Sequence, residues 1–141
     1  MNNKTVPIAL ALTAIAITVA SIATLSVSNN ATVNTVGVEA YSNSACTQPI
    51  TSLNVGNVNP DSVITQTIYI KNSGTIPITL TMLADSWSPT AAPSHLTLTW
   101  NRQNYVLDAD NSVSATLMLS VASDTAGFSA FNCNVTIIGT E

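Results

Sequence analysis

The clearest pattern of hydrophobic and polar positions lies in residues 63–83, VITQTIYIKNSGTIPITLTML, where the two kinds of residue alternate. One face carries Ile64, Gln66, Ile68 and Ile70 in the first half, and Ile76, Ile78, Leu80 and Met82 in the second. A period of two with many β-branched residues is typical of β-strands. Residues 72–75, with Gly74 free to adopt positive φ, supply a turn. The stretch therefore predicts a tight β-hairpin whose apolar face needs a second sheet to cover it.

Shorter runs of the same kind occupy the chain on both sides of residues 63–83. They are residues 35–41, 52–58, 96–100, 105–107, 113–121 and 131–137. Pro89 and Pro93 disfavour a central strand in residues 85–95, which we expect to form a loop. Short strands separated by turns about every ten residues, without an amphipathic helix, are typical of a sandwich. The prediction is all-β: an antiparallel immunoglobulin-like β-sandwich of 7–8 strands in residues 35–141, preceded by one N-terminal hydrophobic helix.

The N-terminal part of the chain has a different pattern. Residues 6–27 form an apolar run without any charged residue, long enough to cross a hydrocarbon core of ~30 Å as a helix. Two interpretations of residues 1–27 stay open: an uncleaved transmembrane signal-anchor, or a signal peptide cleaved near Ala23. In both, Lys4 favours an N-terminus inside and the remainder outside the membrane. Residues 28–34 are polar and are expected to form a short tether.

Composition agrees with a β-protein and narrows the range of partners. Charged residues make up only 7% of the chain, whereas Thr (20), Ser (16) and Asn (15) are abundant. Such a chain covers its outer faces with hydroxyls and amides. The net charge is −4, and Lys4, Lys71 and Arg102 are the only basic residues. Binding to nucleic acid needs a patch of basic residues, so the composition argues against it. The expected partners are the lipid bilayer, through residues 6–27, and other surface proteins or further copies of the chain.

The candidate sites are sites of covalent modification. Cys46 and Cys133 are the only cysteines. Both are expected outside the membrane, where disulfides persist, so they form a candidate disulfide, which could stabilise the fold by about 4 kcal/mol through loop closure. The alternative is that they are two separate small residues. Asn30 and Asn134 each begin an Asn-x-Thr sequence and are candidate glycosylation sites.

Catalytic and metal sites find little support in the sequence. His95 is the only histidine, whereas a blue-copper site needs two. The run from Asp108 to Asn111 has two aspartates, but lacks the glycine and the downstream glutamate of a calcium loop. No nucleophile has a base and an orienting acid in a recognisable motif. We therefore expect no enzyme activity and no cofactor. Trp87 and Trp100 could belong to a carbohydrate platform, although tryptophans in sandwiches more often point inward.

The turn and core residues of the chain resemble those of a known group of proteins. The matching positions are Tyr41, Cys46, Pro49, Gly56, Pro60, Ser62, Tyr69, Lys71, Asn72 and Gly74, and the segment from Trp87 to Trp100 also fits. This pattern is similar to that of small archaeal surface proteins in which a signal-anchor precedes a sandwich ectodomain. More distantly, it resembles the TasA/camelysin biofilm-fibre proteins. The resemblance implies an immunoglobulin-like sandwich at the cell surface.

Two functional classes follow from these observations. In the first, the chain is a non-enzymatic, membrane-anchored module for display, adhesion or envelope interactions. In the second, it is a secreted filament or pilus-type subunit that assembles by donor-strand exchange through residues 32–41. Exchange needs a free N-terminus and therefore cleavage near Ala23, whereas an uncleaved helix keeps this segment beside its own domain.

Overall fold

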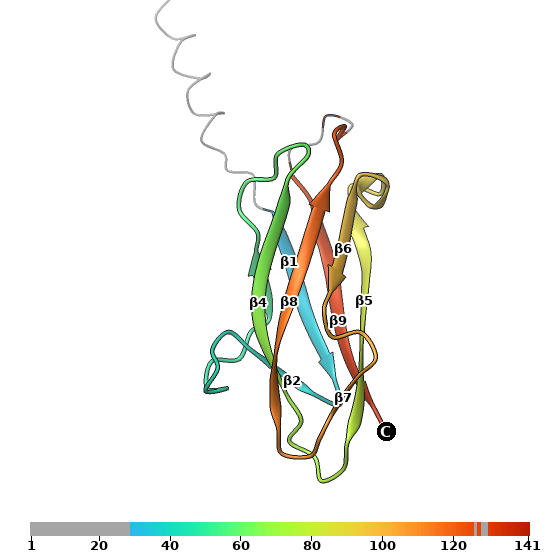
Figure 1. The fold of residues 1–141 in the computed structure, drawn as a ribbon. Coiled ribbons are helices and arrows are strands. Elements are labelled where there is room, and N and C mark those ends of the chain that lie inside the picture. Colours follow the sequence, from blue (N-terminus) through green and yellow to red (C-terminus); the bar gives the residue numbers. More distant parts are fainter. Residues whose placement is uncertain (1–28, 126, 128–129) are drawn as a thin grey trace, which may run out of the picture.

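The computed structural model describes residues 29–125, 127 and 130–141 (Figure 1). The apolar run 6–27 and the expected N-terminal helix lie outside these residues. None of the helices in the described part has the length and hydrophobicity that crossing a membrane requires. The described part is almost entirely β-structure. Its elements are β1 (Asn30–Val36), β2 (Glu39–Tyr41), β3 (Ser52–Asn54), β4 (Val63–Lys71), β5 (Ile78–Ser88), the 3-10 turn η2 (Ala92–Ser94), β6 (Leu96–Trp100), β7 (Tyr105–Leu107), β8 (Ser112–Val121) and β9 (Asn132–Thr140).

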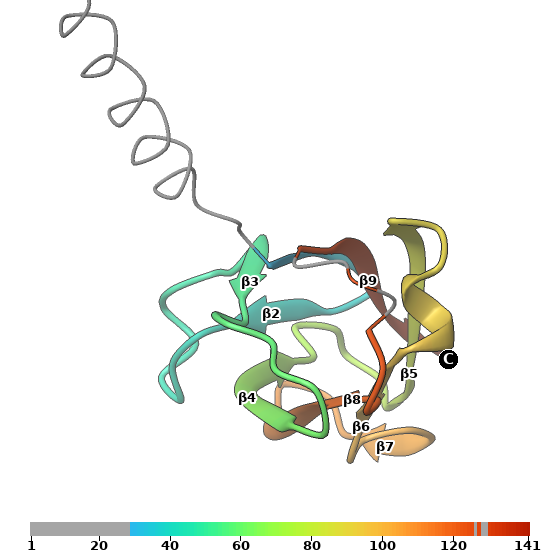
Figure 2. The same ribbon diagram turned by 90° about the horizontal axis from the view of Figure 1, so that it is seen from above.

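The strands form two sheets, which appear as two layers when the molecule is seen from above (Figure 2). One sheet has five strands in the order β3-β1-β9-β5-β7, and the other has four in the order β2-β4-β8-β6. Both sheets contribute to one cluster of buried apolar side chains. Ile68 and Ile70 enter this core from β4, and Leu80 and Ile137 enter it from β5 and β9. Burying each such side chain stabilises the fold by about 2 kcal/mol. The expectation of an all-β protein is confirmed.

The predicted faces of most strands are confirmed because burial alternates along them. In β8, the side chains of Ala115, Leu117, Leu119 and Val121 are buried, as the pattern predicts. In β9, Cys133, Val135 and Ile137 are buried in the same way. The alternation of apolar and polar residues indicates which face of a strand packs on the core. This indication does not depend on which strands pair with it.

The predicted hairpin is wrong. β4 pairs with β2 and β8, whereas β5 pairs with β7 and β9 in the other sheet. The segment between Lys71 and Ile78 therefore carries the chain from one sheet to the other. Two neighbouring strands of a single sheet would both still need cover for their apolar faces. In opposite sheets, the two faces cover each other across the core.

Asn72 fixes the segment that crosses between the two sheets, residues 72–77, which we call the crossing. Its side chain is only 1% exposed. The Nδ2 group donates to the carbonyl oxygens of Ile76 at 2.8 Å and of Leu107 and Asp108 at 3.2 Å, while Oδ1 accepts from the Gly74 N–H at 2.9 Å. The same residues that suggested a tight turn thus build a wider connection, because the asparagine side chain bonds to backbone groups of the connecting segment and of the end of β7.

The first predicted strand, residues 35–41, is divided in two. β1 begins at Asn30, within the stretch expected to be a tether, and pairs with β9; β2 crosses to the other sheet and pairs with β4. The break falls at Gly37, whose φ is +70°, and a Cβ there would lie 2.6 Å from the Gly139 carbonyl oxygen. Only glycine allows this close crossing over β9. The division also explains why the described residues hold nine strands instead of seven or eight.

The expectation of a purely antiparallel arrangement is wrong at one pair. β1 runs parallel to β9 over seven residue pairs, from Asn30 beside Asn132 to Val36 beside Ile138. No turn connects these two strands, so their relative direction is free of the constraint that a hairpin imposes.

Two strand ends also differ from expectation. β5 continues to Ser88, into the predicted loop, after an irregularity between Asp85 and Ser88. Pro89 lies just beyond the end of β5, so it removes no hydrogen bond from the sheet. The strand predicted over residues 52–58 is shorter and ends at Asn54.

Candidate functional site

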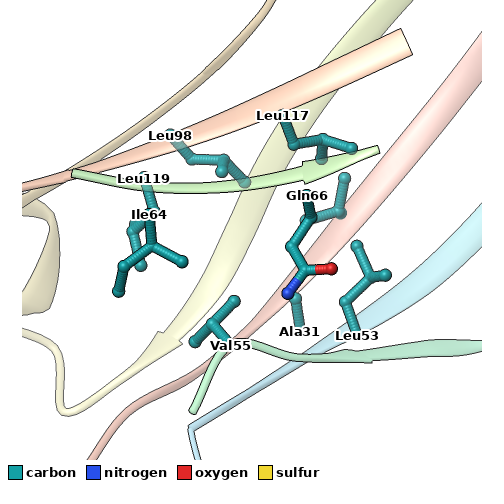
Figure 3. A pocket seen from close by; sticks show the side chains of 9 residues that line it. Ala31, Leu53, Val55, Ile64, Gln66, Leu98, Leu117 and Leu119 are labelled. Atoms are coloured by element: carbon teal, nitrogen blue, oxygen red, sulfur yellow. The ribbon is translucent and has the colours of Figure 1, made fainter. Parts of the chain in front are cut away.

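In the described part of the chain, two hollows stand out, one on each side of the space between the sheets. The first lies between β3 and β4 and is lined by apolar side chains with Gln66 among them (Figure 3). Gln66 reaches across it, and its Nε2 donates to the Asn54 carbonyl oxygen at 3.3 Å. The space that the centre of a water molecule could reach is about 20 Å³. A single water needs ~10–15 Å³ on this measure, so the hollow is a packing defect rather than a ligand site.

The second hollow is larger and lies between β5 and β6, on the opposite side. It is an open groove of about 250 Å³, lined by Met82, Leu98, Thr99, Trp100 and Gln103. The Gln103 carboxamide sits at the groove, where its Oε1 accepts from the Trp100 indole N–H at 2.8 Å and from the Met82 backbone N–H at 3.2 Å. This groove combines an aromatic side chain, apolar walls and the edge of a strand, and it is the best candidate for a binding site on the described part of the chain.

Of the residues that line this groove, only Trp100 was a candidate binding residue from the sequence, and it was paired there with Trp87. Met82, Trp100 and Gln103 come from β5, from β6 and from the turn between β6 and β7, and no local motif joins them. Gln103, an isolated glutamine between two predicted strands, looks like an ordinary turn residue. The groove depends on the order of strands, which places the edges of β5 and β6 on the same side of the molecule.

The two cysteines lie in different surroundings, and both are free thiols in the structure. Cys133 is buried in β9, where desolvation, with a smaller contribution from the charge of Asp85, raises its pKa to about 11. Cys46 lies in the loop between β2 and β3 and is partly exposed, with a backbone φ of 52°. The candidate disulfide stays a prediction from the sequence.

The two candidate glycosylation sites both lie in strands of the five-stranded sheet. Asn30 is in β1 beside Asn54 and Asn132, and Asn134 is in β9 between Thr32 and Asp85. Both side chains are half-buried. They belong to rows of amide and hydroxyl groups on the outer face of this sheet, which accounts for the many Asn and Thr residues without requiring a modification.

The other candidate residues are dispersed. The His95 ring contacts the Asp124 carbonyl oxygen, and the run from Asp108 to Asn111 forms a turn closed by a bond between the Asn111 N–H and the Asp108 oxygen at 3.3 Å. Within the described part of the chain, no three His, Cys, Asp or Glu residues gather as metal ligands would. Trp87 packs inward against Phe131, with ring centroids 5.9 Å apart, so it does not share a platform with Trp100.

One small polar cluster joins β2 to the start of the crossing segment. The Glu39 carboxylate accepts from the Ser73 hydroxyl at 2.7 Å and from the Tyr41 hydroxyl at 2.9 Å. These bonds lower the pKa of Glu39, and the bond with Glu39 raises the pKa of Tyr41. The cluster is open to solvent, so it tethers two segments and offers no enclosed site for chemistry.

Comparison with known proteins adds no relationship. The chain matches no established protein family, and no curated protein is significantly similar to it.

Proposed function

We propose that the chain is a non-enzymatic cell-surface protein, in which residues 6–27 anchor an immunoglobulin-like β-sandwich outside the membrane for display, adhesion or envelope interactions. The proposal draws on the chargeless run at the N-terminus and on the two sheets with one shared core. The turn and core residues that resemble archaeal surface proteins support the same assignment. The dispersed polar side chains around His95 and Asp108 are consistent with a role in binding rather than in catalysis.

The observation that carries the proposal is that Asn29, just before β1, is fixed in the domain by hydrogen bonds of its side chain. Asn29 is buried, its Nδ2 donates to the Gly56 carbonyl oxygen at 2.7 Å, and its Oδ1 accepts from the Phe131 N–H at 3.0 Å. β1 then runs between β3 and β9. A pull on residues before Asn29 would act on a strand paired on both sides, which resists it through many backbone hydrogen bonds at once. This is the arrangement that a module displayed from a membrane needs.

The test uses the exposed thiol. Intact cells that produce the full chain are treated with a membrane-impermeant maleimide after mild reduction, and the mass of the protein is measured. We expect labelling of the wild type, and no labelling of the Cys46→Ser variant because Cys133 is buried. Protection of Cys46 in intact cells, with labelling only after lysis, would show that the domain lies inside and would overturn the proposal. The intact mass also reports cleavage near Ala23 and glycosylation at Asn30 or Asn134.

A second function, assembly into filaments by donor-strand exchange, is favoured by one observation. β1 is the first strand and is covered on its outer side only by β3, which spans three residues. Its departure would expose the long edge of β9, which a β1 strand from a neighbouring copy could fill. Because β2 pairs with β4 in the other sheet, the exchanging segment would be residues 30–36, with Gly37 as the hinge, rather than all of residues 32–41.

Truncation separates these two functions. A chain starting at Thr24 is compared with one starting at Gly37 by size exclusion and electron microscopy. If the longer chain is a stable monomer and the shorter one unfolds, β1 belongs to its own domain, which is the outcome we expect. Polymers formed by the longer chain alone would establish the filament function instead.

A further inference from the structure

The outer edge of the five-stranded sheet is only partly covered by β7. β7 pairs with β5 from Ile78 to Leu80, and the Asn104 N–H closes this contact on the Leu80 carbonyl oxygen at 2.8 Å. β5 itself continues to Ser88. No further strand of the described chain lies on this side of β5. Alternate residues of a strand direct both backbone groups to the same side, so Met82 and Ala84 face this edge as Leu80 does.

Gln103 already occupies the place of a neighbouring strand at this edge. A side-chain carboxamide has the same hydrogen-bonding groups as a peptide unit, and its oxygen accepts from the Met82 N–H as a strand carbonyl would. The bond is long at 3.2 Å, and Gln103 is on the surface. The glutamine therefore protects the edge with a group that can swing away. Open edges are the parts of a sheet to which another extended chain binds most readily.

The groove beside this edge limits which side chains a chain bound at the edge can have. Met82, Leu98 and Trp100 form apolar walls, and none of the five lining residues is charged. A charged group entering the groove would lose water without gaining a counter-ion. At about 250 Å³ the groove is smaller than typical small-molecule pockets of ~300–1,000 Å³, but it accepts apolar side chains of an extended peptide.

We propose that this groove, the β5–β6 groove, binds an extended, uncharged segment of a partner protein, which pairs antiparallel with β5 at Met82 and Ala84 and displaces Gln103. Opposite residues of an antiparallel pair that exchange hydrogen bonds point their side chains to the same face. Met82 points into the groove, so the partner residues that bond to β5 are also those whose side chains enter the groove. Specificity then comes from alternate apolar residues, and affinity comes from the main chain.

The geometry gives a test with a synthetic probe. The isotopically labelled full chain, in detergent micelles, is titrated with a capped heptapeptide in which threonine alternates with valine or leucine. Two further versions carry N-methyl groups, either on the apolar residues or on the threonines. We expect shifts of the Met82 and Ala84 amide signals and of the Trp100 indole signal with the parent peptide. N-methylation of the apolar residues should abolish them, whereas N-methylation of the threonines should leave them.

Two variants test the role of Gln103. Gln103→Ala removes the group that competes with the partner, so we expect the peptide to bind about five- to tenfold more tightly, the factor that one net hydrogen bond is worth. Gln48→Ala changes a glutamine in the distant loop between β2 and β3 and should leave the affinity unchanged. An unchanged Trp87 indole signal, from the core beside Phe131, verifies that both variants are folded.

Several results would overturn the proposal. One is binding that is indifferent to the position of the N-methyl groups, and another is a set of shifts confined to β2 or β3. A third is the absence of binding at millimolar peptide to both the wild type and Gln103→Ala. If an oligosaccharide such as maltohexaose shifts the Trp100 signal and the peptide does not, the groove is a carbohydrate site. The anchoring function does not depend on these outcomes, because it is read from the labelling of Cys46 on cells.

Discussion

Replacing Asn72 by alanine should destabilise the fold strongly, because this polar side chain is almost fully buried. The side chain bonds to four backbone groups, two in the segment between β4 and β5 and two at Leu107 and Asp108, where β7 ends. The bond to the Leu107 oxygen is buried, while the others are partly accessible to water. An orphaned buried acceptor costs about 1–3 kcal/mol, and each rehydrated bond costs at most about 1 kcal/mol. We therefore expect the free energy of unfolding to fall by about 3–4 kcal/mol.

The assay is urea denaturation of the full chain, followed by tryptophan fluorescence, to which Trp87 beside Phe131 contributes. With a slope of about 1–3 kcal/mol per molar urea, the midpoint should fall by roughly 2 M. Asn43→Ala is the matched control. Asn43 also makes three side-chain hydrogen bonds, with Thr47 and Gln48, but in an exposed loop. Its loss should cost less than about 1 kcal/mol.

The comparison of the two asparagines decides whether burial is the cause. If both variants lose the same stability, the number of hydrogen bonds matters and their desolvation does not. If Asn72→Ala loses less than about 1 kcal/mol, the packing of the flanking strands holds the crossing, and the claim that the Asn72 side chain stabilises it is wrong. Asn72→Asp is a further check, because it keeps an acceptor for Gly74 but turns an anionic oxygen toward three carbonyl oxygens. It should be at least as destabilising as alanine.

Two further predictions concern single residues. In the folded, reduced chain at pH 8, a thiol reagent should modify Cys46 and spare Cys133, because the raised pKa of Cys133, about 11, favours the neutral thiol. The same shift makes the stability of the fold depend on pH. The contribution of Cys133 to stability is complete below its unfolded pKa of 9.0 and should decline as the pH rises through about 11. Mass spectrometry checks the labelling, and equal labelling of both thiols in the reduced, folded chain would contradict it. Gly37→Ala should cost more stability than Gly56→Ala, by at least about 1 kcal/mol, because both glycines have a φ of +70° but only Gly37 would bring its Cβ against backbone. Thermal melts of the two variants measure the difference, and equal losses would show that φ alone sets the cost.

The sequence predicted strands and faces well because both follow from local alternation. The buried positions of β8 and β9 follow from residues spaced two apart, and no knowledge of their neighbours is needed. The pairing of strands is a different matter. An alternating segment, a short polar stretch with glycine and a second alternating segment describe a hairpin and a crossing between sheets equally well. What separates the two is where the side chain of Asn72 finds its partners, and two of them, Leu107 and Asp108, lie far along the chain.

The same limit explains why the groove was missed while the cysteines, the histidine and the sequons were noticed. Those residues attract attention by their type, but the structure leaves them dispersed. Met82 and Gln103 are unremarkable in type, and Trp100 drew attention only as part of a carbohydrate platform with Trp87. The three meet beside the part of β5 that β7 leaves uncovered. An open strand edge of this kind promotes uncontrolled association. We propose that the hydrogen bond between Gln103 and the Met82 N–H covers the edge reversibly. A lysine or a proline in the edge strand would instead disfavour pairing with any other strand. Under the proposed function, a cover that can open would let the domain pair with one extended partner and stay soluble without it.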